Sequence, residues 1–184
     1  MLRIKVAGGE LWDERTETFI PVDSVTLRLE HSLISLSQWE AKWKKPFLKE
    51  ISSLTNLKSP EWIDYIRCMT ISSDVPLSAY LALTSAQLNS IFQYVNDPMS
   101  ATWFSDRGKP KKSKEIITSE IIYCQMVMLG IPFECQKWHL NRLMALIRVC
   151  NEKSGPKQTM GRREAAMFNS NLNAARRKAM HTRG

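Results

Sequence analysis

The chain has 184 residues, 43% of them apolar, which is enough to bury an ordinary hydrophobic core within one domain. Its net charge of +8 is unevenly distributed. Residues 153–184 hold eight basic side chains and one acidic one, whereas residues 1–152 hold 18 basic and 17 acidic side chains. The composition excludes a chain that is disordered or strongly basic throughout, and it predicts a nearly neutral body with a basic C-terminal arm.

Residues 1–30 are predicted to form a small N-terminal antiparallel β-sheet of three or four strands. Apolar and polar residues alternate over residues 2–6 and again over residues 25–29, as in strands that bury one face. Residues 10–12 and 17–20 are expected to pair as a hairpin around Asp13 to Thr16. Because so small a sheet is unstable alone, we expect it to pack on the helices that follow.

Residues 31–152 are predicted to form a helical domain with about five helices. Three helix starts are indicated by capping patterns, in which a hydroxyl and a later side chain satisfy free backbone N–H groups. These patterns are Ser35 or Ser37 with Gln38 or Glu40, then Ser59 followed by Pro60, and then Thr84 with Gln87. The third of these helices is expected to end near Asn96.

The last two helices of this domain are predicted to form an antiparallel hairpin over residues 114–151. The first would run over 114–129 and the second over about 134–151, each with an apolar stripe. Gly130 stands where a left-handed C-cap belongs, and Pro132 follows shortly after it. A connection this short makes two helices antiparallel neighbours.

Residues 153–184 form the predicted basic arm, with a helix expected over residues 162–180. Helix-forming residues are plentiful there, but apolar anchors are few, so we expect a partner to order the arm. The chain as a whole is therefore predicted to be a mainly α-helical α+β protein: a small sheet on a helical bundle, with an extended helical arm.

No constellation of residues predicts catalysis, a metal site or a cofactor. Cys135 and His139 are spaced to share a helix face, but the tight Cys-x-x-Cys spacings of structural zinc sites are absent, so packing is the favoured interpretation. The four cysteines are expected to be small buried hydrophobes, and His31 and His181 are expected to be solvated. We therefore expect a protein that is not an enzyme, in a reducing cytosol, with neither a leader peptide nor a membrane-spanning helix.

Binding to another macromolecule is the function that the composition favours. The candidate contact residues are of two kinds, large apolar side chains on helices and cations of the arm. They are Trp39, Trp43, Trp138 and Met144, together with Arg162, Arg163, Arg176, Arg177 and Lys178. A protein partner is favoured over nucleic acid because the arm has one Phe and neither Tyr nor Trp for base stacking. Two further possibilities stay open. The arm could be merely solvated, and the chain could form a homo-oligomer.

The predicted helical hairpin, residues 115–150, resembles a pattern in tail assembly chaperones of long-tailed bacteriophages. The pattern has three parts: a first helix that begins with acidic and apolar residues, a short connection, and a second helix that bears Trp and Leu. The matching positions are Glu120, Ile121 and Tyr123, then Gly130 and Ile131, then Trp138, Leu143 and Leu146. Residues 29–48, residues 138–151 and the C-terminal residues 181–184 also look like parts of phage tail-module proteins of similar length.

The resemblance implies a chaperone or adaptor that coats the helical tape measure protein in the host cell cytoplasm during tail morphogenesis. Two alternatives stay open. One is a structural component of the phage tail or head–tail region, present in the virion, whose arm clasps a neighbouring subunit. The other is a nucleic-acid-binding protein that uses the basic arm. The resemblance brings no catalytic residue and no cofactor.

Overall fold

A computed structural model describes residues 1–14, 17–52, 54–102 and 116–154, with isolated positions between 166 and 177. By its contacts the chain divides into two units, Met1–Cys150 and Asn151–Gly184. The first unit has an α+β fold in which antiparallel strands at the N-terminus pack against helices, as the sequence predicted.

Four strands form two nested antiparallel ladders. They are β1 (Leu2–Val6), β2 (Gly9–Asp13), β3 (Thr18–Val22) and β4 (Val25–Leu29). Strand β1 pairs with β4, and β2 pairs with β3 in the predicted hairpin, where Asp13 lies opposite Thr18. Between the ladders the two chain segments approach closely at Gly8. A Cβ atom there would lie 3.2 Å from the backbone of Ser24 and of Val22, so a larger residue would have to push these backbones apart by a few tenths of an ångström.

The described residues contain seven α-helices and one 3-10 helix. They are α1 (Leu33–Trp43), α2 (Phe47–Ser52), α3 (Pro60–Met69), α4 (Leu77–Leu81), α5 (Ser85–Asn96), α6 (Ser119–Met128), η1 (Phe133–Lys137) and α7 (Leu140–Ser154). The sequence predicted about five helices. It missed α2 and α4, which have six and five residues and are too short to show a helical period.

Two of the three predicted helix starts are confirmed. The Ser59 hydroxyl caps α3, which begins at Pro60, and Thr84 and Gln87 form a capping box that opens α5. The prediction for α1 is wrong, because Ser32 is its N-cap and forms the capping box with Ser35. The chain leaves β4 only three residues earlier, so the first hydroxyl after the strand takes the cap.

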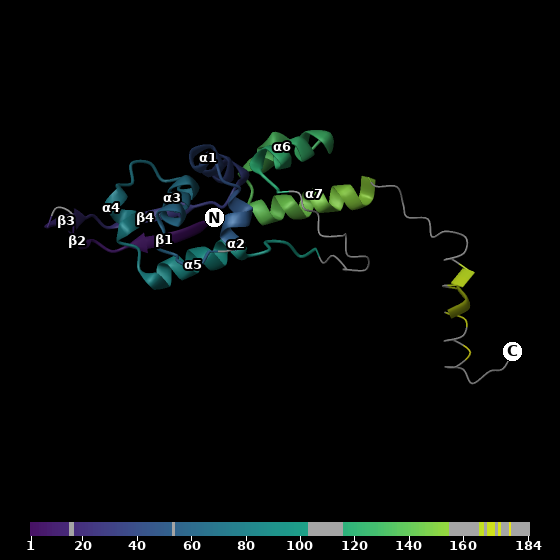
Figure 1. Ribbon diagram of the computed structural model, residues 1–184, viewed down its shortest axis with the longest axis horizontal. Coiled ribbons are helices and arrows are strands. Elements are labelled where there is room, and N and C mark those ends of the chain that lie inside the picture. Colours follow the sequence, from purple (N-terminus) through teal and green to yellow (C-terminus); the bar gives the residue numbers. More distant parts are fainter. Residues whose placement is uncertain are drawn as a thin grey trace. The chain divides into compact units, whose positions relative to one another are not determined.

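The helices cover the face of the β1–β4 ladder on which Ile4, Val6, Leu27 and Leu29 are buried, and its other face is exposed. Figure 1 shows the arrangement of these elements. Helix α1 packs against α3 and α6, α5 lies along β1, and α4 contacts β3. The outer edge of β4 is also partly paired, since the Glu30 N–H donates to the Met69 carbonyl and the Ile71 N–H donates to the Arg28 carbonyl. One continuous apolar core joins these elements. Its fully buried members include Leu27, Leu29, Leu33, Leu36, Ile66, Leu88, Ile91, Ile122, Leu140 and Leu143.

The predicted helical hairpin needs correction in its boundaries and in its packing, because the main helix contact of α6 is with α1 and not with α7. Helix α6 begins at Ser119; residues 116–118 are not helical, and residues 114 and 115 lie outside the described residues. The second helix begins at Leu140, because residues 133–137 form the 3-10 helix η1 and Trp138 is extended. The cause is tertiary pairing: the Leu140 N–H donates to the His31 carbonyl at 2.7 Å, which fixes the turn before α7. Gly130 has the predicted left-handed conformation, with φ of 64°.

Candidate partner-binding surface

Helix α6 is apolar on nearly every side, yet it is only partly buried. Its one charged residue is Glu120, and its buried residues are Ser119, Ile122 and Met126. A helix that is apolar all round normally lies within a core. The outer side of α6 therefore presents apolar side chains to solvent without the polar face that an ordinary surface helix would show.

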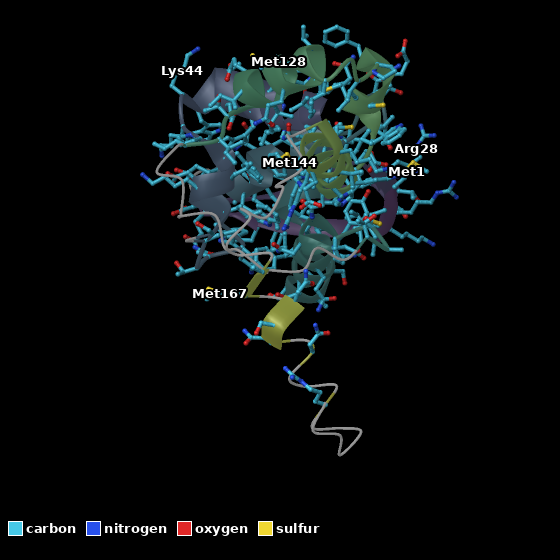
Figure 2. All side chains as sticks on the ribbon, turned by 90° about the vertical axis from the view of Figure 1, so that its right-hand side faces the viewer. Met1, Arg28, Lys44, Met128, Met144 and Met167 are labelled. Atoms are coloured by element: carbon cyan, nitrogen blue, oxygen red, sulfur yellow. The ribbon has the colours of Figure 1, made fainter. Side chains whose placement is uncertain are left out.

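Exposed side chains gather at the C-terminal end of α6 and the start of η1. We call Cys124, Val127, Met128 and Phe133, with half-buried Tyr123, the α6 surface. Val127, Met128 and Phe133 are 63%, 78% and 53% exposed. The Cys124 and Met128 sulfur atoms lie 3.9 Å apart, and the Tyr123 and Phe133 ring centroids lie 6.4 Å apart. Met128 is labelled on the outside of the molecule in Figure 2. No charged residue occurs between positions 121 and 133, so a partner would meet an uncharged apolar surface.

A buried carboxylate holds this surface in place. Glu40 of α1 is 7% exposed, and its Oε2 accepts the backbone N–H of Ser119 at 2.7 Å. Its Oε1 accepts the N–H of Phe47, the first residue of α2, at 2.9 Å. Because one carboxylate satisfies the starts of two helices, the beginning of α6 is fixed on α1.

Of the predicted apolar contact residues, Trp138 is the one that lies at the surface. It is 36% exposed, and the Arg142 guanidinium carbon lies 4.5 Å above its ring in a cation–π contact. Met144 is half-buried against the core. Trp39 is 2% exposed and donates its indole N–H to the Glu61 carbonyl, so its role is packing.

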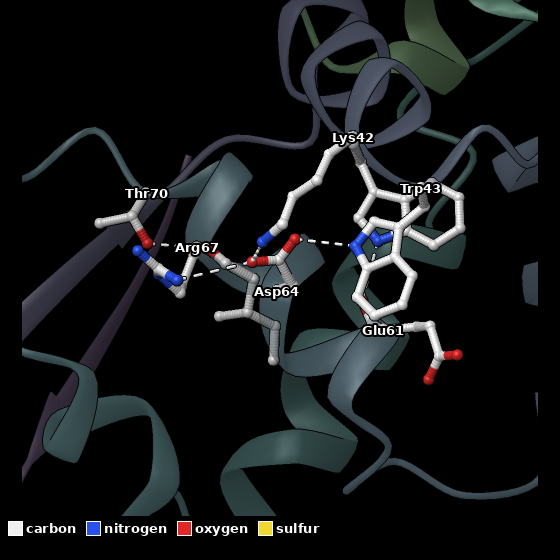
Figure 3. A network of polar contacts seen from close by, with 8 residues as sticks. Lys42, Trp43, Glu61, Asp64, Arg67 and Thr70 are labelled. Carbon is white, nitrogen blue, oxygen red and sulfur yellow. Dashed lines mark hydrogen bonds and ion pairs between the residues drawn. The ribbon is translucent and has the colours of Figure 1, made fainter.

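Trp43 is also engaged within the fold, in a polar network around Asp64 (Figure 3). Its indole Nε1 donates to Asp64 Oδ2 at 2.8 Å, and Lys42 Nζ donates to Oδ1 at 2.6 Å. Arg67 lies 3.6 Å from the same Oδ1. Burial alone would raise the pKa of Asp64, but the hydrogen bonds from Lys42 and Trp43 outweigh it and hold that pKa below its usual value. The network fastens α1 to α3.

The cations predicted to contact a partner lie mostly beyond the described residues. Arg177 is exposed and helical, whereas Arg162, Arg163, Arg176 and Lys178 are not described, and neither is His181. The prediction that the arm binds a partner therefore stays a prediction.

Two histidines are buried where β4, α5 and α7 pack together. His31 is 1% exposed, so the expectation that it is solvated is wrong. Its Nδ1 lies 2.5 Å from the Tyr65 hydroxyl, and its ring centroid lies 5.0 Å from that of His139. His139 Nε2 donates to the Tyr94 carbonyl at 3.0 Å. Burial lowers the pKa of His31 to about 3, with His139 adding to the effect, and burial also lowers the pKa of His139.

The cysteines do not assemble a metal site in the described part of the chain. No group of three or more His, Cys, Asp or Glu side chains there could hold a metal ion. Cys135 is buried as expected, and Cys68 and Cys150 are half-buried. Cys124 is exposed, which corrects the expectation that all four are buried, because it lies on the outer side of α6.

A pocket of about 230 Å³ lies between α1, α2 and α3. Its walls include Trp39, Phe47 and Trp62, with Lys45 and Glu61 also among its lining residues. The Trp62 Nε1 is buried without an acceptor in the described residues.

No protein-family model matches the chain, and no curated protein or solved structure matches it. Among the described residues, no helix is long and apolar enough to cross a membrane. The sequence analysis did not single out the exposed residues of α6, because it gave this segment one apolar stripe and expected Cys124 to be buried. The signal that could have found them is the lack of a polar side on a helix of only ten residues.

Proposed function

We propose that the protein binds an amphipathic helix of another protein on the α6 surface and serves as an assembly chaperone or adaptor, not as an enzyme. The observation that carries this proposal is the uncharged apolar surface around Met128, held at its start by Glu40. Exposed apolar patches of this kind are typical of interaction sites. A partner helix would supply the apolar stripe that covers it.

The strength of such contacts suits a chaperone. Full burial of a Val, Met or Phe side chain contributes about 1.5–3 kcal/mol, so side chains that are half exposed offer roughly 1–2 kcal/mol each. Most of this is offset by the entropy of association, so each site has moderate affinity. A client with many helical segments would gain its overall affinity from many such sites and could still be released stepwise.

The client we propose is the helical tape measure protein of a long-tailed phage, in the host cytoplasm. The resemblance of residues 115–150 to tail assembly chaperones supports this choice, because the α6 surface lies within that segment. A tape measure protein without its tube would expose long apolar stripes. Those stripes match the chemistry of the α6 surface.

Co-expression with the tape measure protein tests the proposal. The wild-type chain is expected to keep the client soluble, and Val127→Lys with Met128→Lys is expected to abolish this effect. Leu77→Lys with Leu81→Lys is the matched control, since these residues are 53% and 51% exposed on α4. If the client aggregates equally with and without the wild-type chain, or if both double variants act alike, the proposal fails.

A further inference from the structure

An apolar groove with a volume of about 210 Å³ lies between α3 and α4. Leu77 and Leu81 of α4 are one helical turn apart, so they share a face, and they are 53% and 51% exposed. Pro60 and Ile63 line the α3 side of the groove. An apolar side chain of a partner that entered the groove would cover the two exposed leucines.

The charged side chains around this groove are positive in net. Lys58 lies two residues before α3 and Arg67 lies in its last turn, and both line the groove. Among the described residues, Lys58 has no carboxylate within ion-pair distance, and Arg67 shares the buried Asp64 with Lys42. Even when Asp74 of the adjoining pocket is counted, three cations face two carboxylates. The groove therefore suits a partner that combines apolar side chains with negative charge.

The hairpin of β2 and β3 presents this combination. Trp12 of β2 and Phe19 of β3 are cross-strand partners, 49% and 63% exposed, with ring centroids 4.9 Å apart. Glu10 shares their face of the hairpin, because alternate residues of a strand point to the same side. Residues 10–17 hold four carboxylates and one cation. Figure 1 shows this hairpin extending beyond β1 and β4, away from α7, so another molecule can reach it.

We propose that the groove between α3 and α4 binds the acidic, aromatic hairpin of a second copy of this chain. Within one copy Trp12, Phe19, Leu77 and Leu81 are all exposed, so the hairpin does not fill its own groove and the contact needs two copies. Strand β3 contacts α4 within each copy, so hairpin and groove lie near each other, as a two-fold dimer that exchanges hairpins requires. Aromatic anchors in apolar pockets are typical of protein interfaces. This proposal does not rest on the binding of a helix by α6.

Sedimentation equilibrium of the full chain tests the contact. The wild type is expected to dimerise with a dissociation constant on the order of 10 μM, because so small a contact binds weakly. A hairpin variant, Trp12→Thr with Phe19→Thr, and a groove variant, Leu77→Glu with Leu81→Glu, should each weaken dimerisation at least about thirtyfold. An equal mixture of the two variants should associate again, because one supplies an intact groove and the other an intact hairpin. Circular dichroism confirms that each variant is folded.

The role of charge is tested on the same dimer. Glu14→Gln with Glu17→Gln removes two carboxylates from the hairpin tip and should weaken dimerisation at least about threefold at low salt. The difference from the wild type should disappear at about 1 M salt, where surface charges are screened. Glu120→Gln with Glu134→Gln makes the same charge change at exposed positions elsewhere and should have no effect.

The α6 surface provides the control that separates this contact from the proposed binding of a client. Val127→Lys with Met128→Lys should dimerise like the wild type. If this variant loses dimerisation while the hairpin variant keeps it, the two copies meet through α6 and the proposal is wrong. It is also wrong if the mixture associates no better than either variant alone, or if the wild type is monomeric at every concentration. A monomeric wild type whose groove binds an acidic helical peptide would show that the occupant is another protein.

Discussion

Glu40 accepts a hydrogen bond from the backbone N–H of Ser119 at 2.7 Å, although 79 residues separate the two in sequence. Thr118, the N-cap residue of α6, makes no side-chain capping bond, so the free N–H at the start of the helix depends on this distant carboxylate. The second oxygen of Glu40 serves α2 through Phe47. The side that α6 leaves exposed is therefore set by a residue of α1.

Replacing Glu40 should destabilise the fold strongly. Glu40→Ala removes the acceptor of two buried N–H groups and should lower the free energy of unfolding by roughly 3–5 kcal/mol, while Glu40→Gln keeps one good acceptor and should cost about half of that. Urea unfolding measures both, with exposed Glu134→Ala as the control. Hydrogen exchange should accelerate at residues 119–126 before it does in α3. Equal stability of Glu40→Ala and the control would contradict this role.

Asp64 should stabilise the protein at neutral pH and not in acid. Its pKa is lower in the folded protein than the ordinary 3.8, so its stabilising effect is complete above that value and is lost as the pH falls through the folded pKa. We expect Asp64→Asn to lower stability by about 1–2 kcal/mol at pH 7, because Lys42 is largely exposed and its contribution is screened. In urea unfolding, the difference between the variant and the wild type should shrink as the pH falls below 3.8, and a difference that stayed constant there would contradict the assignment.

Mild acid should destabilise the protein through the two buried histidines. The folded pKa of His31 is about 3, so the unfolded chain takes up a proton below the ordinary value of 6.5 while the folded chain does not. Stability is complete above pH 6.5 and falls below it, with a slope approaching about 1.4 kcal/mol per pH unit for His31.

The interval from pH 7 to pH 5 isolates this effect, because most carboxylates titrate lower. His31→Gln with His139→Gln should be less stable than the wild type at pH 8 but nearly independent of pH over that interval. Urea unfolding at each pH measures both curves. A flat curve for the wild type would contradict the burial of two neutral imidazoles.

Gly130 should be needed for its backbone conformation alone. Its φ of 64° is the left-handed region, and a Cβ atom there would meet no heavy atom within 4 Å. Gly130→Ala should therefore cost about 1 kcal/mol, and Gly130→Asn should cost less because Asn tolerates this region. Thermal unfolding measures the difference. A loss of several kcal/mol would mean that the side chain meets an obstacle.

Local patterns predicted much of the fold correctly. Alternating residues indicated the strands, and the hydroxyl-capping patterns at Ser59 and Thr84 indicated two helix starts. These features depend on neighbours in sequence. The predicted start of α7 was wrong, because the actual start depends on the hydrogen bond from the Leu140 N–H to the His31 carbonyl, which no local pattern encodes. The burial of His31 was missed for the same reason.

The candidate surface was less predictable than the fold. Trp39 and Trp43 were chosen for their size, but they pack against one another and against α3. The residues that face solvent on α6 have the same apolar character as core residues. Only the packing of α6 on α1 shows which side is covered.

The accessibility of Cys124 in a complex with a helical client tests the central claim most directly. This thiol lies within the α6 surface beside Met128, so its alkylation rate shows whether a partner covers the surface. Peptide mass spectrometry separates it from the other three cysteines. With saturating tape measure protein we expect alkylation of Cys124 to slow at least about tenfold, while that of half-buried Cys68 stays unchanged. A bound client that leaves the Cys124 rate unaltered would contradict the account.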